Sequence, residues 1–326
     1  MPVQSGAIPL IVTDRVPGPT LAHWTVVAHC PACGASGDAT RALLPDTHYR
    51  FGKERILIPE QGISVIECGD CGLYYKTTVP APSYLKEVFE RQAASKWKAA
   101  KRPSVQVASL REMRTGRTCD LLDVGAAGGA LLGAFAARGV RGRRSALDIM
   151  RYPGIEAHLA GEFIEGFIDD PLPAWSCEPY DLVTLLDVVE HLYCPRTAFE
   201  NLRLLVKRSG RVFIETGNPG SEWPRRFGIG EWYYVRLLEH HIFWSLRSLQ
   251  RIAADFGFRL IEWKMVRHKS RRRLLRARLP IDLVKMGLYG AAPRYYSAIA
   301  NAFGGQGNQP WDPIVRDHFQ VCLLRT

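Results

Sequence analysis

Long hydrophobic runs are missing from this chain of 326 residues. No apolar stretch approaches the roughly 18 residues that a membrane-spanning helix needs. The N-terminus, MPVQSGAIPLIVTDR, also lacks the basic start and long apolar centre of a secretion signal. We therefore expect a cytoplasmic protein.

Two common phosphate-binding motifs are also missing. The chain has no phosphate loop ending in Gly-Lys-Ser/Thr. The dinucleotide pattern G-x-G-x-x-G fails because its second and third glycines would fall on Ala127 and Ala130. A nucleotide site in this chain must therefore follow another pattern.

Acidic residues are outnumbered by basic ones, 32 against 43, which gives a net charge of +11. This excess of positive charge is typical of proteins that bind nucleic acid, an anionic membrane surface or an acidic substrate. It is equally typical of a protein whose arginine side chains are simply solvated at the surface. Hydrophobic residues make up 47% of the chain. A chain of this length and composition has room for one large domain and one small one.

The stretch Thr118–Asp148 has the pattern of a strand–helix–strand unit. Cys119–Val124 is an apolar run of strand type, and small residues fill Gly125–Gly129. Ala130–Arg138 has the apolar spacing of a helix, and Arg144–Asp148 is a second strand with an acidic end. Such a unit binds a nucleoside-containing cofactor.

The residue types of this stretch suit that ligand. A cofactor approaches backbone closely only where side chains are tiny, and glycine also tolerates a turn of positive φ. The helix N-terminus after the turn offers N–H donors. Asp148, which stands 25 positions after Asp123, is placed to accept both ribose hydroxyls.

Polar residues also follow a second apolar strand. Leu182–Leu186 is too apolar for an exposed strand and fits a central parallel one. Asp187, Glu190 and His191 come directly after it, at the edge where open α/β sheets bind ligands.

Four of the eight cysteines form two Cys-x-x-Cys pairs, Cys30 with Cys33 and Cys68 with Cys71. Each pair is followed by a glycine that permits a tight turn, so both sulfurs of a pair point at one place. Four thiolates are the tetrahedral set that zinc prefers, and we expect a structural zinc ion. Four free thiols or a redox dithiol are the alternatives.

Three motifs together resemble one family. Asp123–Gly129 reads DVGAAGG and resembles the D-x-G-x-G-x-G motif of class I S-adenosylmethionine-dependent methyltransferases, with Ala127 in place of the middle glycine. Asp187–Leu192 reads DVVEHL and is similar to the fourth motif of the ubiquinone-biosynthesis-like group. Glu239–Ser245 resembles the E-H-x-x-x-F-S element of the same group, with Trp244 in place of the phenylalanine.

The resemblance implies an α/β fold: a seven-stranded Rossmann-like methyltransferase sheet with a small N-terminal zinc ribbon and a helical insertion before the last strand. The expected divisions are a leader (1–25), the zinc ribbon (26–80), a helical cap (81–116) and the methyltransferase domain (117–326). The insertion, 264–314, starts with a strongly basic run that favours peripheral contact with a membrane or nucleic acid, or simply a solvated face.

The resemblance also implies a set of site residues. His240 is the favoured general base, with its neighbour Glu239, and His191 is the second choice. The expected residues for S-adenosylmethionine are Asp123, Gly125, Ala126, Ala127, Gly129, Asp148, Asp169 (for the adenine amino group) and Asp187. The expected substrate-binding residues are Tyr75, Glu190, Asn218, Arg225 and Trp232.

The predicted function is methyl transfer to a small molecule, as in bacterial enzymes that modify sugars, polysaccharide precursors or secondary metabolites. An RNA base methyltransferase is the first alternative, since the ribbon and the positive charge would suit RNA, although no Asn-Pro-Pro-Tyr-type motif follows the fourth strand. A cofactor-binding scaffold without catalysis is the second alternative.

Overall fold

A computed structural model of the chain describes residues 23–36, 39–44, 46–51, 54–96, 113, 115–171, 178–266, 284, 287–288, 291–292 and 316–326. Nearly all of the expected leader, the second half of the helical cap and most of the basic insertion lie outside these residues. None of the described helices is long and apolar enough to cross a membrane.

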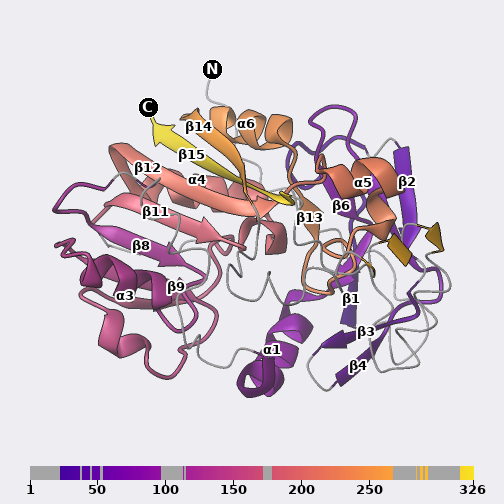
Figure 1. The fold of residues 1–326 in the computed structure, drawn as a ribbon, viewed down its shortest axis with the longest axis horizontal. Coiled ribbons are helices and arrows are strands. Elements are labelled where there is room, and N and C mark those ends of the chain that lie inside the picture. Colours follow the sequence, from indigo (N-terminus) through magenta and orange to yellow (C-terminus); the bar gives the residue numbers. More distant parts are fainter. Residues whose placement is uncertain are drawn as a thin grey trace.

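A mixed sheet of seven strands forms the larger part of the molecule (Figure 1). Its order is β10-β9-β8-β11-β12-β15-β14. The first five strands run parallel, and β15 is antiparallel to both of its neighbours. The strands are β8 (Leu121–Val124), β9 (Arg144–Asp148), β10 (Phe163–Glu165), β11 (Tyr180–Leu186), β12 (Val206–Gly217), β14 (Phe258–Val266) and β15 (His318–Arg325). The predicted seven-stranded fold is confirmed.

Helices cover both faces of this sheet because its central strands are buried on both sides. α3 (Ala130–Ala137) packs Leu131 and Phe135 into one apolar cluster. α4 (Pro195–Leu205) and α6 (Leu246–Asp255) contribute to a separate cluster. Neighbouring residues of β11 divide between the two clusters, Leu182 to the first and Val183 to the second, as the alternation of a strand requires.

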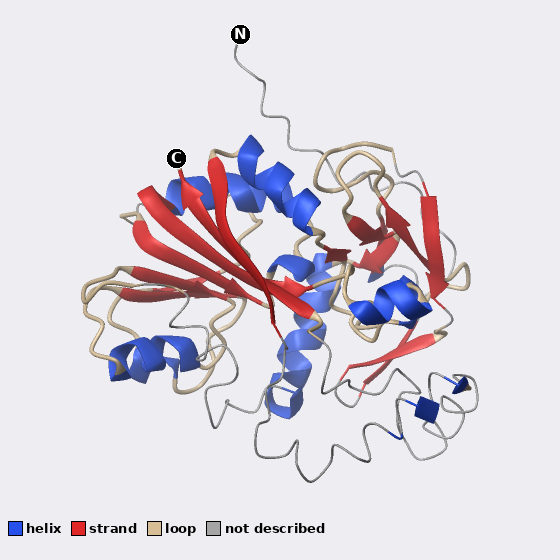
Figure 2. Cartoon of the chain, turned by 45° about the horizontal axis from the view of Figure 1, so that its top comes forward, coloured by secondary structure: helices blue, strands red, loops and turns tan. Residues whose placement is uncertain are grey.

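A second body of short strands carries the two cysteine pairs. Its main sheet has the order β13-β6-β5-β2, and two smaller pairings, β1-β7 and β3-β4, lie beside it (Figure 2). The strands are β1 (Trp24–Val26), β2 (Ala39–Leu44), β3 (His48–Phe51), β4 (Glu54–Leu57), β5 (Ile63–Glu67), β6 (Tyr74–Lys76), β7 (Thr78–Pro80) and β13 (Ile242–Phe243). The edge strand β13 comes from the second half of the chain, so the two bodies share one sheet.

Five further elements lie outside the sheets and the helices named above. They are α1 (Pro82–Lys96), α5 (Glu222–Phe227) and the 3-10 turns η3 (Ile155–His158), η4 (Val189–His191) and η5 (Ile229–Glu231). The sequence predicts a helix around 155–160, and the structure has only the single turn η3 there. It predicts a loop after β12, whereas the chain forms α5 and η5 in that region. The sequence predicts Ser245 as the N-cap of the helix that follows it, and in the structure it caps α6 through a capping box with Ser248.

Candidate active site

A cavity opens at the carboxyl ends of β8, β9 and β11, and we call it the sheet-edge cavity. Its walls come from the turn after β8, the end of β9, residues 166–169, residues 187–188 and residues 191–193, together with Leu85 and Phe89 of α1. Parallel strands place the residues that follow them at one edge, which explains why these distant segments meet.

The turn after β8 uses left-handed backbone at every second residue. Gly125, Ala127 and Gly129 have φ of 69°, 45° and 74°. These are the three positions at which the family motif has glycine. A residue with a Cβ pays about 1–2 kcal/mol of conformational energy to adopt left-handed backbone, and glycine does not. Ala127 adopts it nonetheless, and its N–H donates to Asp148 Oδ2 at 2.8 Å.

Asp148 closes the cavity from the end of β9. Its side chain is 8% exposed and lines the sheet-edge cavity. Burial raises the pKa of this carboxyl to about 6, although N–H donors of Ala127, Ile149 and Met150 favour the charged form. Three backbone N–H groups therefore fix this carboxyl at the wall of the cavity.

Three of the expected cofactor-binding residues, Asp123, Ala126 and Gly129, do not line the sheet-edge cavity. Asp123 is buried between β8 and β11, where it accepts a hydrogen bond from Thr184 Oγ1 at 2.6 Å. Burial raises its pKa to about 7. Ala126 is buried in the cluster beneath α3, and Gly129 precedes that helix. These residues shape the turn from below.

The other two expected acids, Asp169 and Asp187, do line the sheet-edge cavity. Asp169 Oδ2 accepts from the backbone N–H groups of Tyr193 and Cys194 at 2.7 and 2.9 Å. Burial raises the pKa of Asp169. These bonds join the segment after β10 to the start of α4 and fix one wall of the cavity.

Asp187 has a partner that the sequence did not reveal. It takes a φ of 54°, and its Oδ1 lies 3.6 Å from Nε2 of His318 on β15. His318 is fully buried, and its Nδ1 lies 3.0 Å from Asp317 Oδ1. Burial by itself would lower the pKa of His318, but Asp317 and Asp187 outweigh it and raise the pKa. His318 is the first residue of an apolar strand and belongs to no motif, so the sequence does not mark it as a functional residue.

The turn after β11 brings Glu190, His191 and His240 together. The Nδ1 of His191 lies 2.6 Å from Glu239 O, and the Nδ1 of His240 lies 3.0 Å from Tyr234 O. The two imidazole rings are 4.8 Å apart and nearly perpendicular. His191 lines the sheet-edge cavity, whereas His240 is 5% exposed and lies behind it.

Glu190 anchors this group and has no exposed surface. Its Oε2 accepts from Thr216 Oγ1 at 2.8 Å, and its Oε1 accepts from the Tyr234 hydroxyl. The Tyr234 oxygen also accepts from Gly217 N–H at 3.2 Å. The carboxylate is thus held between η4, the end of β12 and the loop before β13.

The remaining predicted substrate residues do not line the sheet-edge cavity. Trp232 is fully buried and stacks on Tyr234 with centroids 4.9 Å apart. Asn218 Oδ1 accepts from Gly220 N–H at 2.9 Å and so shapes a turn. Arg225 is exposed on α5. Their role toward a substrate stays a prediction.

Tyr75, the last predicted substrate residue, lines a second cavity between the cysteine-bearing body and the start of α4, which we call the ribbon cavity. Lys76 is 1% exposed there, and its Nζ donates to Tyr49 Oη and Leu237 O. Burial lowers the pKa of Lys76 to about 7. Buried His241 also lines this cavity, and its ring nitrogens have no hydrogen-bond partner among the described residues.

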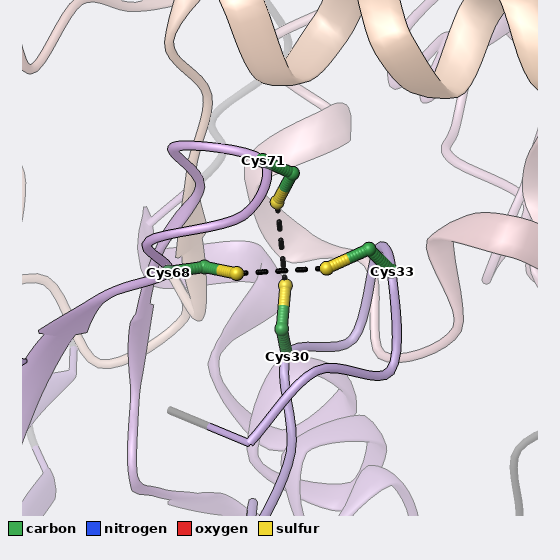
Figure 3. Close-up of side chains that lie close together, drawn as sticks. All are labelled: Cys30, Cys33, Cys68 and Cys71. Atoms are coloured by element: carbon green, nitrogen blue, oxygen red, sulfur yellow. Dashed lines mark hydrogen bonds between the residues drawn. The ribbon is translucent and has the colours of Figure 1, made fainter. Parts of the chain in front are cut away.

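The four cysteines converge on one point (Figure 3). Cys30 and Cys71 have sulfurs 3.5 Å apart, as do Cys33 and Cys68, and all four sulfurs lie within 4.8 Å of one another. Zinc with bonds of about 2.3 Å separates tetrahedral sulfurs by about 3.8 Å. The spacing of this four-cysteine cluster therefore fits a zinc ion.

The two cysteine turns are built alike. In each, the glycine after the second cysteine donates its N–H to the first cysteine's carbonyl at 2.8 Å, from Gly34 to Cys30 and from Gly72 to Cys68. The glycines have φ of 77° and 76°. This repeated turn aims both sulfurs of a pair in one direction, as the sequence predicts.

The sheet, the turn of alternating left-handed residues and the acid at the end of β9 define a class I S-adenosylmethionine-dependent methyltransferase. The chain belongs to this family: the sequence profile described as "Methyltransferase domain" matches residues 83–262. The predicted family is confirmed, and S-adenosylmethionine is its methyl donor.

The curated relatives share only about a third of the aligned residues with this chain. The chain is 31% identical over 150 residues to a ubiquinone biosynthesis O-methyltransferase of Vibrio campbellii, a match over 42% of this chain and 63% of that protein. A protein of the same description from Bordetella avium is 33% identical over 126 residues, covering 36% of this chain and 51% of that protein. The chain thus spans less than two thirds of these relatives.

Two solved structures of methyltransferases align with most of this chain. A putative methyltransferase from Bacillus halodurans aligns over 67% of this chain and 96% of its own, with 16% identity and a TM-score of 0.46. The 1,6-didemethyltoxoflavin-N1-methyltransferase of Burkholderia thailandensis aligns over 82% of this chain and 97% of its own, with 14% identity and a TM-score of 0.45.

Alanine substitutions at Gly125 and Gly128 test the role of the left-handed turn, with Gly128 as the control. A Cβ on Gly125 would lie 2.6 Å from Val188 Cγ2 at a φ of +69°, whereas a Cβ on Gly128 would meet nothing within 4 Å. We expect Gly125→Ala to lower the free energy of unfolding by about 1–3 kcal/mol and to weaken S-adenosylhomocysteine binding at least tenfold. Gly128→Ala should change stability by less than about 0.5 kcal/mol. Denaturant titration and calorimetry test both, and equal effects would contradict this reading of the turn.

The raised pKa of Asp148 predicts a pH dependence of cofactor binding. Ribose hydroxyls donate to the charged carboxylate, which protonates as the pH falls through about 6. The dissociation constant of S-adenosylhomocysteine should therefore rise below pH 6, by up to about tenfold per pH unit. Calorimetry from pH 5 to 8 measures it. Asp148→Asn should flatten the profile, and an unchanged profile in that variant would assign the titration to another group.

Proposed function

We propose that this chain transfers the methyl group of S-adenosylmethionine to a small-molecule acceptor, with His191 or His240 as the general base. The observation that carries this proposal is that His191 lines the same cavity as Asp148 and the turn after β8. A base and a cofactor site that face one cavity are what methyl transfer to a bound acceptor requires.

The cofactor supplies a methyl group that is already activated on a sulfonium. What the protein must add is alignment and removal of a proton. Asp148 would hold the ribose, and Asp169 lies on the cavity wall where it would meet the adenine. Asp187 follows the end of β11 and lines the same cavity.

The histidines have a defined tautomer for this task. A carbonyl oxygen only accepts hydrogen bonds, so Nδ1 of both His191 and His240 carries the proton it donates to a backbone carbonyl. The basic nitrogen of each ring is then Nε2. His191 is the better placed of the two because it reaches the cavity wall.

The acceptor is proposed to be a hydroxyl-bearing metabolite. The curated relatives are described as ubiquinone biosynthesis O-methyltransferases, which favours oxygen as the attacking atom. Sugars, polysaccharide precursors and secondary metabolites offer the same group. RNA would need an open basic surface at the cavity, and the described residues that line the sheet-edge cavity include no lysine or arginine.

We also propose that the four-cysteine cluster holds one structural zinc ion. Four protein ligands leave no open coordination position, so this zinc would have no part in the chemistry. Its effect would be to fix the two turns that precede β6 and follow β1.

The test of the proposed function is a transfer assay with methyl-labelled S-adenosylmethionine, run against hydroxylated aromatic compounds, nucleotide sugars and RNA. We expect label in a small molecule, and His191→Ala should lower kcat by about 10²–10⁴-fold. The dissociation constant for S-adenosylhomocysteine should change far less. Label in RNA alone would replace this proposal with the RNA enzyme, and a bound cofactor with no transfer to any acceptor would favour the scaffold.

Metal analysis of cysteine variants tests the zinc proposal. Cys30→Ser and Cys71→Ser should each contain one equivalent of zinc less than Cys194→Ser, a part-exposed cysteine outside the cluster. Both should also unfold at a lower temperature than that control. Equal zinc in all three proteins, or a disulfide within the cluster, would contradict the assignment.

A further inference from the structure

We propose that His318 is a positioning residue for the cofactor site. Its imidazolium holds the Asp187 carboxylate at the wall of the sheet-edge cavity, where that carboxylate binds the ammonium group at the amino-acid end of S-adenosylmethionine. The inference rests on the proposed function, because it assigns a further part of the same site. Three observations support it: the order of the acids along the sheet edge, the ion pairs of His318 and the backbone conformation of Asp187.

The acids that line the sheet-edge cavity follow the order of the strands. The strands β10, β9, β8 and β11 are successive neighbours; Asp169 follows β10, Asp148 ends β9 and Asp187 follows β11. Adjacent strands lie about 4.8 Å apart, so about 10 Å separates β9 from β11. With adenine at Asp169 and ribose at Asp148, the amino-acid end of an extended cofactor would cross the turn after β8 and reach Asp187.

Asp187 is the acid of this wall that is best placed to bind a cation. Asp169 Oδ2 already accepts from the N–H groups of Tyr193 and Cys194, and Asp148 is assigned to the ribose hydroxyls. The Asp187 side chain is 24% exposed and lines the cavity. Hydrogen bonds between an ammonium group and a carboxylate are about twice as strong as those between neutral groups. A carboxylate at this position therefore suits the ammonium group of the cofactor.

His318 reaches Asp187 from the far side of a strand. β12 lies between β11 and β15, and His318 pairs with Gly217 at the end of β12. Nε2 of His318 lies 3.6 Å from Asp187 Oδ1, and its Nδ1 lies 3.0 Å from Asp317 Oδ1. Only the imidazolium carries a proton on both nitrogens, so carboxylates on both sides favour the charged ring. The two ion pairs thus join the start of β15 to the end of β11.

The surroundings of His318 keep it charged and in place. Asp317 is itself fixed, since its Oδ2 accepts from Tyr233 Oη at 3.1 Å. The Tyr234 ring packs edge-on against the His318 ring, with centroids 5.0 Å apart. Buried Glu215 of β12 adds negative charge on the side of the neighbouring strand. These acids outweigh the cost of burying the imidazolium.

The backbone of Asp187 is the third observation. Its φ of 54° is left-handed, a conformation that aspartate adopts more readily than most residues with a side chain. Its N–H donates to Glu215 O at 2.9 Å. Such backbone persists only where surrounding contacts determine it, and it is concentrated at ligand sites. The ion pair with His318 is a contact of this kind, and it holds the carboxylate at the cavity wall.

Calorimetry with two ligands tests this site: S-adenosylhomocysteine, and its analogue that lacks only the amino group. The wild type should bind S-adenosylhomocysteine at least about tenfold more tightly, because the analogue cannot make a hydrogen bond to a charged group. Asp187→Asn removes the charge and should reduce this preference to less than about threefold. His318→Gln keeps an N–H donor without the charge and should reduce the preference at least about threefold.

Asp181→Asn is the matched control, because Asp181 lies at the opposite end of β11 and pairs with Lys207. It should keep the wild-type preference. The preference is a ratio of two dissociation constants measured on one preparation, so a general loss of stability does not change it. His318→Asn is a second variant that removes the imidazolium, and it should give the same result as His318→Gln.

A preference that Asp187→Asn retains would overturn the ammonium site. A preference that is lost in Asp187→Asn but intact in His318→Gln and His318→Asn would overturn the positioning role of His318. A wild-type protein that binds both ligands equally refutes only this inference. A wild-type protein that binds neither ligand refutes the proposed function as well.

Discussion

The hydrogen bond from Ala127 N–H to the Asp148 carboxylate is the contact on which the cofactor site depends. It ties the turn after β8 to the end of β9, two elements that are neighbours in the sheet. The carboxylate also accepts from the N–H groups of Ile149 and Met150, but only the bond from Ala127 reaches the turn. Both partners line the sheet-edge cavity. Ala127, which replaces the middle glycine of the motif, can still make this hydrogen bond because the donor is its backbone N–H.

The cysteine-bearing body is connected to the active site through backbone. The turn of Cys68 and Cys71 leads directly into β6, and β6 pairs with β13 in the register Tyr75 to Ile242. His240 and His241 immediately precede β13, and Lys76 N–H donates to His241 O. A zinc ion in the cluster would therefore steady the histidine segment without touching it. This gives the ribbon a structural purpose that needs no nucleic acid.

Sequence predicts well where chemistry is local. The turn at Gly125–Gly129 and each Cys-x-x-Cys pair are defined by spacing within a few residues, so their geometry follows from the pattern. Sequence fails where a function is made by distant segments. His318 lies on the last strand and meets Asp187 only because β15 inserts beside β12. The sequence predicts Trp232 as a substrate-binding residue, yet the side chain is fully buried. Removing the large apolar surface of a tryptophan from water stabilises this inward packing. The separation of His191 from His240, one on the cavity wall and one behind it, likewise depends on tertiary packing.

The central claim is that a nucleoside lies over the turn after β8 with its ribose on Asp148. The most direct measurement is a crystal structure of the protein grown with S-adenosylhomocysteine. The account predicts density in the sheet-edge cavity, with both ribose hydroxyls within hydrogen-bond distance of the Asp148 carboxylate and the sulfur near His191. Density for the nucleoside in the ribbon cavity, or a ribose that does not contact Asp148, would contradict it.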